Sequence, residues 1–287
     1  MPGESQIDPD GDAWLLPDAQ VLELDDVLRH YDTHGWARLG RVMNDEGLEA
    51  LRERALDLML GRVTYDGLFF QMDAKTGRYE DAPIGLGWQG PSLAYRKLEK
   101  LELDPRFRAW MRNALFERIA RARFGGERVN LYRAILFNKG EGGGSDIPWH
   151  QDGGRLWGLS EDPELQLWTA LDDAPIGGGC LEVVSGSHRG GLATPLGGVV
   201  PRDRVDSANA DAQAVPLPAV AGEVILVHNH LWHRSGRSET GQRRLGMSVC
   251  FMSDRVRCLR KRKTPRRFFE VFPAMATGTA NGPVTSR

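Results

Sequence analysis

The chain has few cysteines, no strong excess of either charge and no long apolar run, and each lack excludes a class of protein. Its three cysteines, among 287 residues, are odd in number and form no C-x-x-C pair, so neither a disulfide framework nor a cysteine zinc site is indicated. The 37 Lys plus Arg nearly balance 39 Asp plus Glu, which gives no global case for nucleic acid or an acidic membrane surface. No stretch approaches the ~20 apolar residues of a membrane span, and residues 1–12 lack the pattern of a secretory signal. We therefore expect a cytoplasmic globular protein.

Glycine, in contrast, is abundant at 34 residues, which favours tight turns in a β-rich core. Helical patterns are confined to the first part of the chain, at residues 25–33, 44–60 and 105–124. A short strand is expected at residues 36–40, and residues 62–95 lack a clear period and are predicted to form a long connection.

Beyond residue 126 the pattern changes to short strands separated by glycine turns, at residues 128–138, 165–171, 179–184, 222–228 and 245–252. Strands without intervening helices favour an antiparallel sandwich or jelly roll over a parallel α/β sheet. We predict a single domain over residues 1–287 that is mainly β. It would comprise a helical front at about 20–125, a jelly-roll core at about 126–254 and a basic tail at 255–287.

A candidate metal motif lies at Pro148-Trp149-His150-Gln151-Asp152. In a strand, residues i and i+2 point to the same face, so His150 and Asp152 can both reach one ion. A second histidine cluster, at residues 228–233, follows the apolar residues 224–227 and offers His228, His230 and His233 as the third ligand. Two histidines and one carboxylate leave open positions on an octahedral metal, as in non-haem Fe(II) oxygenases. For a lone histidine, a buried, hydrogen-bonded core residue is the favoured interpretation, but here several features agree and favour metal ligation.

Five ordered motifs resemble the phytanoyl-CoA dioxygenase family of Fe(II)- and 2-oxoglutarate-dependent oxygenases. They cover most of the chain, from Leu28 to about Met252. They are the helix–glycine–strand opening at residues 28–36, the H-Q-D motif at 150–152, the W-x-A strand at 168–170, the G-C-L and G-S-H turn at 179–188, and His233-Arg234-Ser235-Gly236 with Arg244 eleven residues after His233. This resemblance implies a double-stranded β-helix (a cupin-like jelly roll) and an iron-dependent dioxygenase.

The resemblance also implies roles for particular residues. His150, Asp152 and His233 would be the iron ligands, and Arg244 would bind the distal carboxylate of 2-oxoglutarate, the co-substrate used together with O2. Arg243 is adjacent to Arg244, but a strand sends neighbours to opposite faces, and counting back from Ser248 favours Arg244. Three further residues match positions that contact 2-oxoglutarate in the family: Ser235, Trp168 and Lys97. Lys97 could equally be a solvated lysine beside Arg96, and His188 of the G-S-H turn is expected to have a structural role.

The implied reaction is the hydroxylation of a small organic molecule with release of succinate and CO2. Because relatives that halogenate lack the metal carboxylate, Asp152 favours hydroxylation. Residues 62–95 and 188–218 are expected to flank the barrel mouth and form a lid or specificity surface.

The substrate and partners remain open at this level. Eight basic residues and no acid lie between residues 255 and 267, which suits a substrate linked to coenzyme A or to an acyl carrier, a nucleic acid, or simply a solvated face. The solvated face is the favoured interpretation. A non-catalytic metal-binding jelly roll is the alternative from another functional class.

Overall fold

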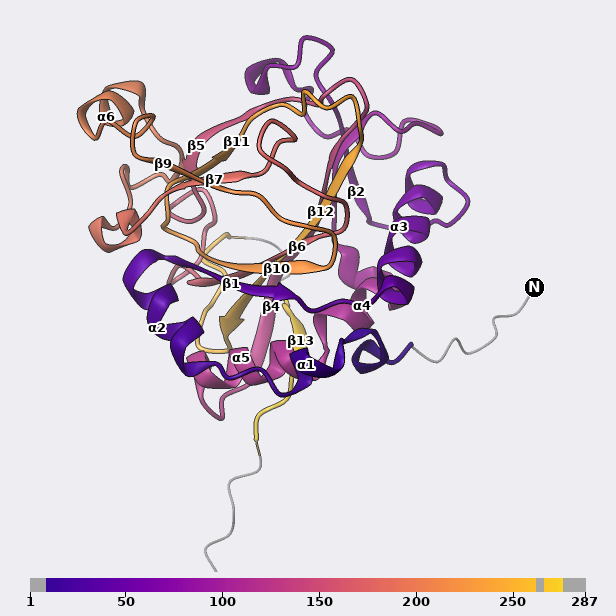
Figure 1. Cartoon of the computed structure of the whole chain (residues 1–287), viewed down its shortest axis with the longest axis vertical. Helices are drawn as coiled ribbons and strands as arrows, with labels where there is room; N and C mark the ends of the chain where they lie inside the picture. Colours follow the sequence, from indigo (N-terminus) through magenta and orange to yellow (C-terminus); the bar gives the residue numbers. More distant parts are fainter. Residues whose placement is uncertain (1–8, 262–265, 276–287) are drawn as a thin grey trace, which may run out of the picture.

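Two antiparallel β-sheets face each other at the centre of the computed structural model, which describes residues 9–261 and 266–275 (Figure 1). The larger sheet has the strand order β1-β10-β6-β12-β4-β3-β2, and β13 also pairs with β4. Its strands are β1 (Trp36–Arg41), β2 (Phe69–Met72), β3 (Tyr95–Glu99), β4 (Val129–Lys139), β6 (Leu165–Ala170), β10 (Glu223–His228), β12 (Arg244–Ser253) and β13 (Phe269–Phe272). The smaller sheet has the order β8-β5-β11-β7-β9, with β5 (Ile147–Gln151), β7 (Leu181–Val184), β8 (Gly198–Val199), β9 (Ala214–Leu217) and β11 (His233–Ser235). This arrangement confirms the predicted jelly roll.

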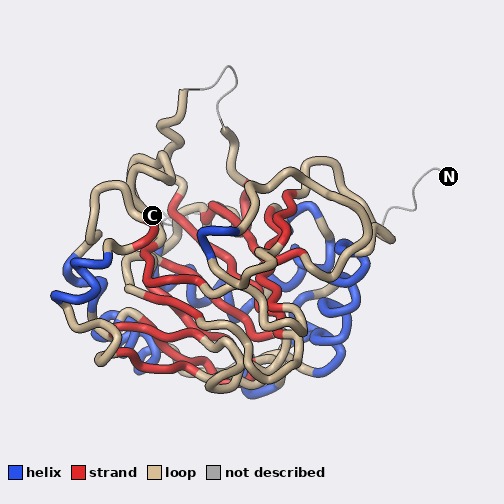
Figure 2. The backbone as a smooth tube through the Cα atoms, turned by 90° about the horizontal axis from the view of Figure 1, so that it is seen from above, coloured by secondary structure: helices blue, strands red, loops and turns tan. Residues whose placement is uncertain are grey.

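Helices within residues 17–124 pack on the outer face of the larger sheet (Figure 1), and Figure 2 shows helices bordering the strands. The α-helices are α1 (Pro17–Gln20), α2 (Asp25–His34), α3 (Asp45–Met59), α4 (Pro105–Met111), α5 (Ala114–Phe124) and α6 (Arg202–Ser207); 3-10 turns lie at Gly11–Trp14, Tyr79–Asp81, Leu101–Leu103 and Ser187–Gly190. The helix expected at residues 44–60 is α3, whose first turn is capped by the Asn44 side chain accepting from the Gly47 amide.

Alternation along the central strand β12 separates the core from the barrel interior. Leu245, Met247 and Val249 point outward into the large core beneath the helices, whereas Arg244 and Ser248 line an interior cavity. Trp168 of β6 and Val227 of β10 also face inward, where they pack against the smaller sheet. All ten residues of β12 are buried because both of its faces are covered.

The sequence prediction was wrong about one helix and incomplete about several strands. Residues 105–124 form two helices, because Asn113 starts a new helix by accepting a hydrogen bond from the Phe116 amide. The strand expected at residues 36–40 is β1, but the front also supplies β2 and β3 to the larger sheet, and the basic tail supplies β13. Strands β2, β8, β9 and β13 have four residues or fewer, too few to show a period in the sequence.

Asp104 connects α3 and α4, and its substitution tests how much this connection stabilises the fold. Its carboxylate caps α4 by accepting from the Arg106 amide and pairs with Arg54 at 3.0 Å, with Asp104 fully buried. We expect Asp104→Ala to lower the free energy of unfolding by about 3–5 kcal/mol in urea titrations, because it leaves the Arg54 charge buried and unpaired. As a control, Asp45→Ala removes a solvent-exposed pair with Arg41 and should cost less than about 1 kcal/mol. A cost for Asp104→Ala as small as that of the control would contradict this account.

Candidate iron and 2-oxoglutarate site

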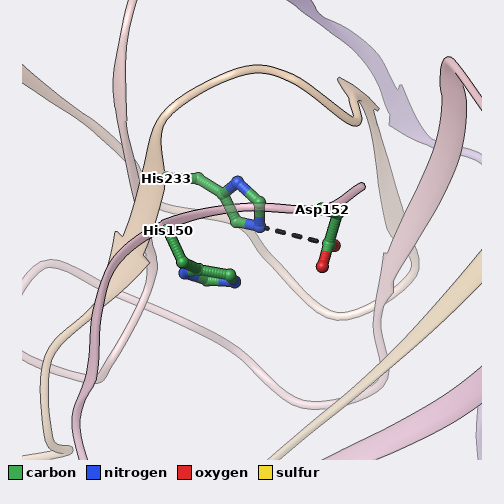
Figure 3. A group of neighbouring side chains, drawn as sticks. All are labelled: His150, Asp152 and His233. Carbon is green, nitrogen blue, oxygen red and sulfur yellow. Dashed lines mark ion pairs between the residues drawn. The ribbon is translucent and has the colours of Figure 1, made fainter. Parts of the chain in front are cut away.

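Antiparallel pairing of β5 with β11 brings the predicted ligands together. His150 on β5 is the direct register partner of His233 on β11, and their ring centroids are 4.0 Å apart. Asp152 follows β5 by one residue and points to the same side as His150 (Figure 3). One nitrogen or oxygen atom from each of the three residues lies within 4.8 Å of the others. Neither His228 nor His230 belongs to this group.

Backbone carbonyls fix the orientation of both imidazoles. The Nδ1 atom of His150 is 2.9 Å from the Pro148 carbonyl oxygen, and that of His233 is 2.8 Å from the Leu231 carbonyl oxygen. Each Nδ1 therefore donates its proton, which leaves the lone pair on Nε2 free. Burial, together with the neighbouring His233, lowers the pKa of His150 to about 4, so this imidazole is neutral at pH 7. Two free imidazole nitrogens and a carboxylate fit a divalent transition metal.

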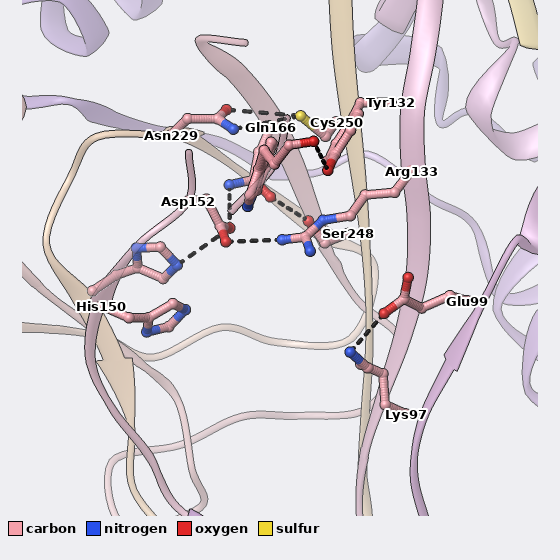
Figure 4. A network of polar contacts seen from close by, with 12 residues as sticks. Lys97, Glu99, Tyr132, Arg133, His150, Asp152, Gln166, Asn229, Ser248 and Cys250 are labelled. Atoms are coloured by element: carbon pink, nitrogen blue, oxygen red, sulfur yellow. Dashed lines mark hydrogen bonds and ion pairs between the residues drawn. The ribbon is translucent and has the colours of Figure 1, made fainter. Parts of the chain in front are cut away.

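Two donors hold the Asp152 carboxylate from behind (Figure 4). Nη2 of Arg133 donates to its Oδ1 at 2.8 Å, and Nε2 of Gln166 donates to its Oδ2 at 2.7 Å. Gln166 is oriented in turn by the Ser248 hydroxyl, which donates to Oε1 at 3.1 Å. Burial acts to raise the pKa of Asp152, but the Arg133 charge and the two nearby histidines outweigh it and hold the pKa well below its usual range. The carboxylate is thus charged and fixed in position.

The loop before His233 is fastened to the strand that carries His150. The Asn229 carbonyl accepts from the Asp152 amide at 2.8 Å, and the His230 carbonyl accepts from Nε2 of Gln151 at 2.6 Å. The His230 ring contacts the Asp162 carboxylate at 2.9 Å. His188 lies 3.2 Å from the Asp32 carbonyl, consistent with its expected structural role.

A cavity of about 460 Å³ extends from the three ligands between the two sheets. Arg244 lies on its wall with 3% of its surface exposed, and its guanidinium is 5.5 Å from the Trp168 ring centroid. Nη2 donates to the Gly179 carbonyl, but the buried Nε has no hydrogen-bond partner among the described residues. Burial lowers the pKa of Arg244 to about 10, as expected for a buried cation that lacks an anion. The neighbouring Arg243 points away, with its Nε 3.7 Å from Asp172.

The other predicted co-substrate contacts also line this cavity. Ser235 is two residues beyond His233 on β11 and lines the cavity beside it. Lys97 lines the cavity on β3 but forms an ion pair of 2.6 Å with Glu99, so it is not the solvated lysine that was the alternative. Arg244, Ser235 and Trp168 thus line the same cavity, and the unpartnered Nε of Arg244 is a donor suited to a carboxylate.

Sequence reasoning missed Lys139, the register partner of Arg244 on β4. Its Nζ donates to the Ser145 carbonyl at 2.6 Å, and burial and the Arg244 charge lower its pKa to about 7. The signal was present, since Arg133, Ile135, Phe137 and Lys139 alternate along β4 and all line the cavity. The signal was not recognised because the sequence alone does not say which face of β4 points into the barrel. That face is defined only by the strands that pair with β4, which are β12 and β3.

Only one of the two segments expected at the mouth contributes to the cavity wall. Gln71, Tyr79, Glu80 and Ala82 come from residues 62–95, whereas none of residues 188–218 lines the cavity. Residues 198–199 of the second segment nevertheless pair with His150 and Gln151 of β5, so its place at the mouth stays a prediction. That segment instead forms β8, α6 and β9 at the edges of the smaller sheet.

The basic tail is partly tied to the body of the protein. Nη2 of Arg266 donates to the Tyr132 carbonyl at 2.6 Å, Arg260 donates to the Leu156 carbonyl, and Arg255 is 3.3 Å from Glu127. Arg262 and Lys263 lie outside the described residues. Several of these charges therefore serve contacts within the chain itself. Across the described residues, the helices lack the length and apolar character needed to cross a membrane.

Comparisons with solved structures agree with this fold. The chain superposes with a TM-score of 0.67 on the non-heme alpha ketoglutarate dependent epimerase SnoN from nogalamycin biosynthesis, at 16% identity over 89% of this chain and 98% of SnoN. It superposes with a TM-score of 0.65 on EctD from S. alaskensis, solved with 2-oxoglutarate and 5-hydroxyectoine, at 18% identity over 91% of this chain and 89% of EctD. At these identities the likeness shows the fold.

Curated proteins similar in sequence to this chain include two phytanoyl-CoA dioxygenases. Phytanoyl-CoA dioxygenase 1 from Oryza sativa subsp. japonica is 27% identical over 77% of this chain and 85% of its own length. Phytanoyl-CoA dioxygenase from Arabidopsis thaliana is 26% identical over 78% and 87%. The predicted enzyme class, a non-haem iron- and 2-oxoglutarate-dependent dioxygenase, is confirmed by this relationship and by the triad. The phytanoyl-CoA dioxygenase family model matches residues 31–246, which is most of this chain. The chain therefore belongs to that family.

Proposed function

We propose that the protein hydroxylates a small organic molecule and releases succinate and CO2 from 2-oxoglutarate. The observation that carries this proposal is the presence, in one buried cavity, of a two-histidine, one-carboxylate triad and a guanidinium with an unpartnered Nε. The triad would hold Fe(II), and Arg244 with Ser235 would hold the distal carboxylate of 2-oxoglutarate. A guanidinium suits this task because it donates two parallel hydrogen bonds to one carboxylate.

Fe(II) with O2, when bound, would supply the oxidation that splits 2-oxoglutarate and transfers oxygen to the substrate. The chain's own residues position the metal ligands and shelter the reacting centre from solvent. The carbonyls of Pro148 and Leu231 keep Nε2 of each histidine directed at one point, and Arg133 and Gln166 keep Asp152 charged and oriented. Trp168, Leu181 and Val227 give the cavity an apolar wall, which would limit the access of water to the reacting centre.

A free small molecule is favoured over a carrier-linked acyl chain. The carrier alternative depended on the basic tail, and three of its arginines already bind carbonyls or a carboxylate of this chain. Hydroxylation is favoured over halogenation because Asp152 occupies the position that a halide would need.

Binding of 2-oxoglutarate tests the role of Arg244. Under anaerobic conditions with Fe(II), we expect the wild-type protein to bind 2-oxoglutarate with a weak visible charge-transfer band. Arg244→Lys should raise the dissociation constant at least tenfold, since lysine cannot form the two parallel bonds and one charged hydrogen bond is worth about 1.5–3 kcal/mol. Arg243→Lys, on the opposite face of the strand, is the matched control and should bind like wild type.

In air, the wild-type protein should form succinate slowly by itself and faster with members of a small-molecule panel. Asp152→Ala should abolish this turnover. A non-catalytic metal-binding protein would form no succinate even as the wild type. A folded wild-type sample that neither binds 2-oxoglutarate nor forms succinate would reject the proposed function.

The support of Asp152 predicts an effect on metal affinity. Arg133→Met removes the donor to Oδ1 of Asp152 and leaves all three metal ligands in the sequence. Loss of such a hydrogen-bond partner commonly lowers metal affinity 10–100-fold. We expect a loss of about this size for Co(II), measured by its visible spectrum, and a smaller loss for Ser248→Ala, which acts only through Gln166. Equal affinities in wild type and Arg133→Met would show that the ion pair does not position the carboxylate.

Lys139 predicts a pH dependence of co-substrate binding. Its pKa of about 7 in the free protein should rise when a carboxylate binds beside Arg244, so binding takes up a proton above pH 7. The affinity for 2-oxoglutarate should therefore fall as the pH rises from 7 to about 9. Titration calorimetry with Mn(II) in place of Fe(II) measures this dependence. Lys139→Met should flatten it, and an unchanged slope in that variant would contradict the assignment.

A further inference from the structure

An irregularity in the β2–β3 pair directs a second buried arginine into the cavity. Met72 pairs with Tyr95 and Gln71 pairs with Lys97, so Arg96 is an extra residue on β3. Tyr95 and Leu98 pack in the outer core, whereas the consecutive residues Arg96 and Lys97 both line the cavity. A β-bulge is the device that re-aims a side chain in this way, and bulges are common beside active sites.

Arg96 is 8% exposed and has no ion-pair or hydrogen-bond partner for its side chain within residues 9–261 and 266–275. Its guanidinium carbon lies 5.0 Å from the Tyr79 ring centroid. The nearest acids are occupied elsewhere, since Asp73 accepts from the Ser145 amide at 3.1 Å and Asp146 accepts from the Tyr79 amide at 2.9 Å. Burial lowers the pKa of Arg96 from its ordinary value. The charges of Asp73 and Asp146 act on Arg96 without forming an ion pair with it, so the position for a contacting anion is open.

The other cations of the cavity have partners or a task already. Lys97 pairs with Glu99, Arg133 with Asp152, and Arg234 with Glu182. Lys139 donates to the Ser145 carbonyl, and Arg244 is the candidate for 2-oxoglutarate. Arg96 is the cavity cation of the described chain for which neither a partner nor a task is accounted for.

Arg96 and Arg244 stand at different places on the cavity wall. Arg96 lies on β3 and Arg244 on β12, with β4 between them, so their backbones are about 10 Å apart. With one carboxylate at Arg244, the rest of the co-substrate extends toward the triad on the opposite, smaller sheet. Arg96 instead faces Tyr79, in the segment that supplies Glu80 and Ala82 to the cavity wall. Loops of this kind commonly determine specificity.

We propose that Arg96 binds an oxyanion of the primary substrate, a carboxylate or a phosphate, and so selects an anionic small molecule. This inference rests on the proposed function and specifies its substrate class. The bulge presents the guanidinium, Tyr79 supports one of its sides, and the substrate anion supplies the missing charge. The bound anion would hold the remainder of the substrate in the same cavity as the triad.

The test is a calorimetric panel on the protein loaded with Mn(II) and 2-oxoglutarate, without O2. The probes are small alkyl and aryl carboxylates, each paired with its primary amide, and phosphate monoesters, each paired with the parent alcohol. In the wild type, at least one anion should bind about tenfold or more tightly than its neutral partner, equivalent to ~1.4 kcal/mol. Arg96→Gln should abolish that preference and Arg96→Lys should retain part of it. Both variants should bind 2-oxoglutarate within about twofold of wild type.

Arg78→Gln is the matched control, because it removes a largely exposed charge that pairs with Asp81 in the same segment; it should keep the anion preference. The inference is overturned if no anion is preferred, if Arg96→Gln keeps the preference, or if Arg96→Gln weakens 2-oxoglutarate itself about tenfold, which would place Arg96 in the co-substrate site. Failure of the wild type to bind 2-oxoglutarate in the first titration would instead reject the proposed function.

Discussion

The chemistry of this protein depends on one register, the antiparallel pairing of β5 with β11 that places His150 opposite His233. Because strand side chains alternate, a slip of one residue between these strands would turn one of the two imidazoles away from the cavity and break up the site. The bonds from Asp152 and Gln151 to the loop at 229–230 hold this register at the open end of the pair. The helices have no direct part in the site, but they bury the outer face of the larger sheet and so fix the wall that the ligands face.

The residues that line the cavity carry more positive than negative charge. Its lining contains six cations but only two acids, Glu80 and Asp152. A divalent metal and a dicarboxylate together add no net charge, so their binding leaves this excess in place. Some of the excess is offset by acids just outside the cavity, such as Glu99 and Glu182. The remainder is the charge that the proposed substrate anion at Arg96 would offset.

The pairing of His150 with Asp152 was predicted from a local signal, an H-x-D pair in strand phase, whereas the choice of His233 as third ligand came from the family resemblance. Arg244 was distinguished from Arg243 by the same alternation, and the structure places the two on opposite faces. Lys139 and Arg96 could not be predicted, since their direction depends on the phase of β4 and on a bulge in β3. The break between α4 and α5 was missed because a capping asparagine inside an apolar pattern is also compatible with a continuous helix. The features that the sequence did not predict therefore depend on contacts between distant strands or lie at the end of a helix.

The central claim is that His150, Asp152 and His233 bind one iron ion. Crystals grown without O2 in the presence of Fe(II) and 2-oxoglutarate, measured at the iron absorption edge, test it most directly. The account predicts a single anomalous peak within about 2.3 Å of Nε2 of both histidines and of one Asp152 oxygen, a distance typical of first-row metal ligands. The same crystals should show the distal carboxylate of 2-oxoglutarate at Arg244. A fully loaded crystal whose peak lies elsewhere, or contacts only one of the three side chains, would contradict the account.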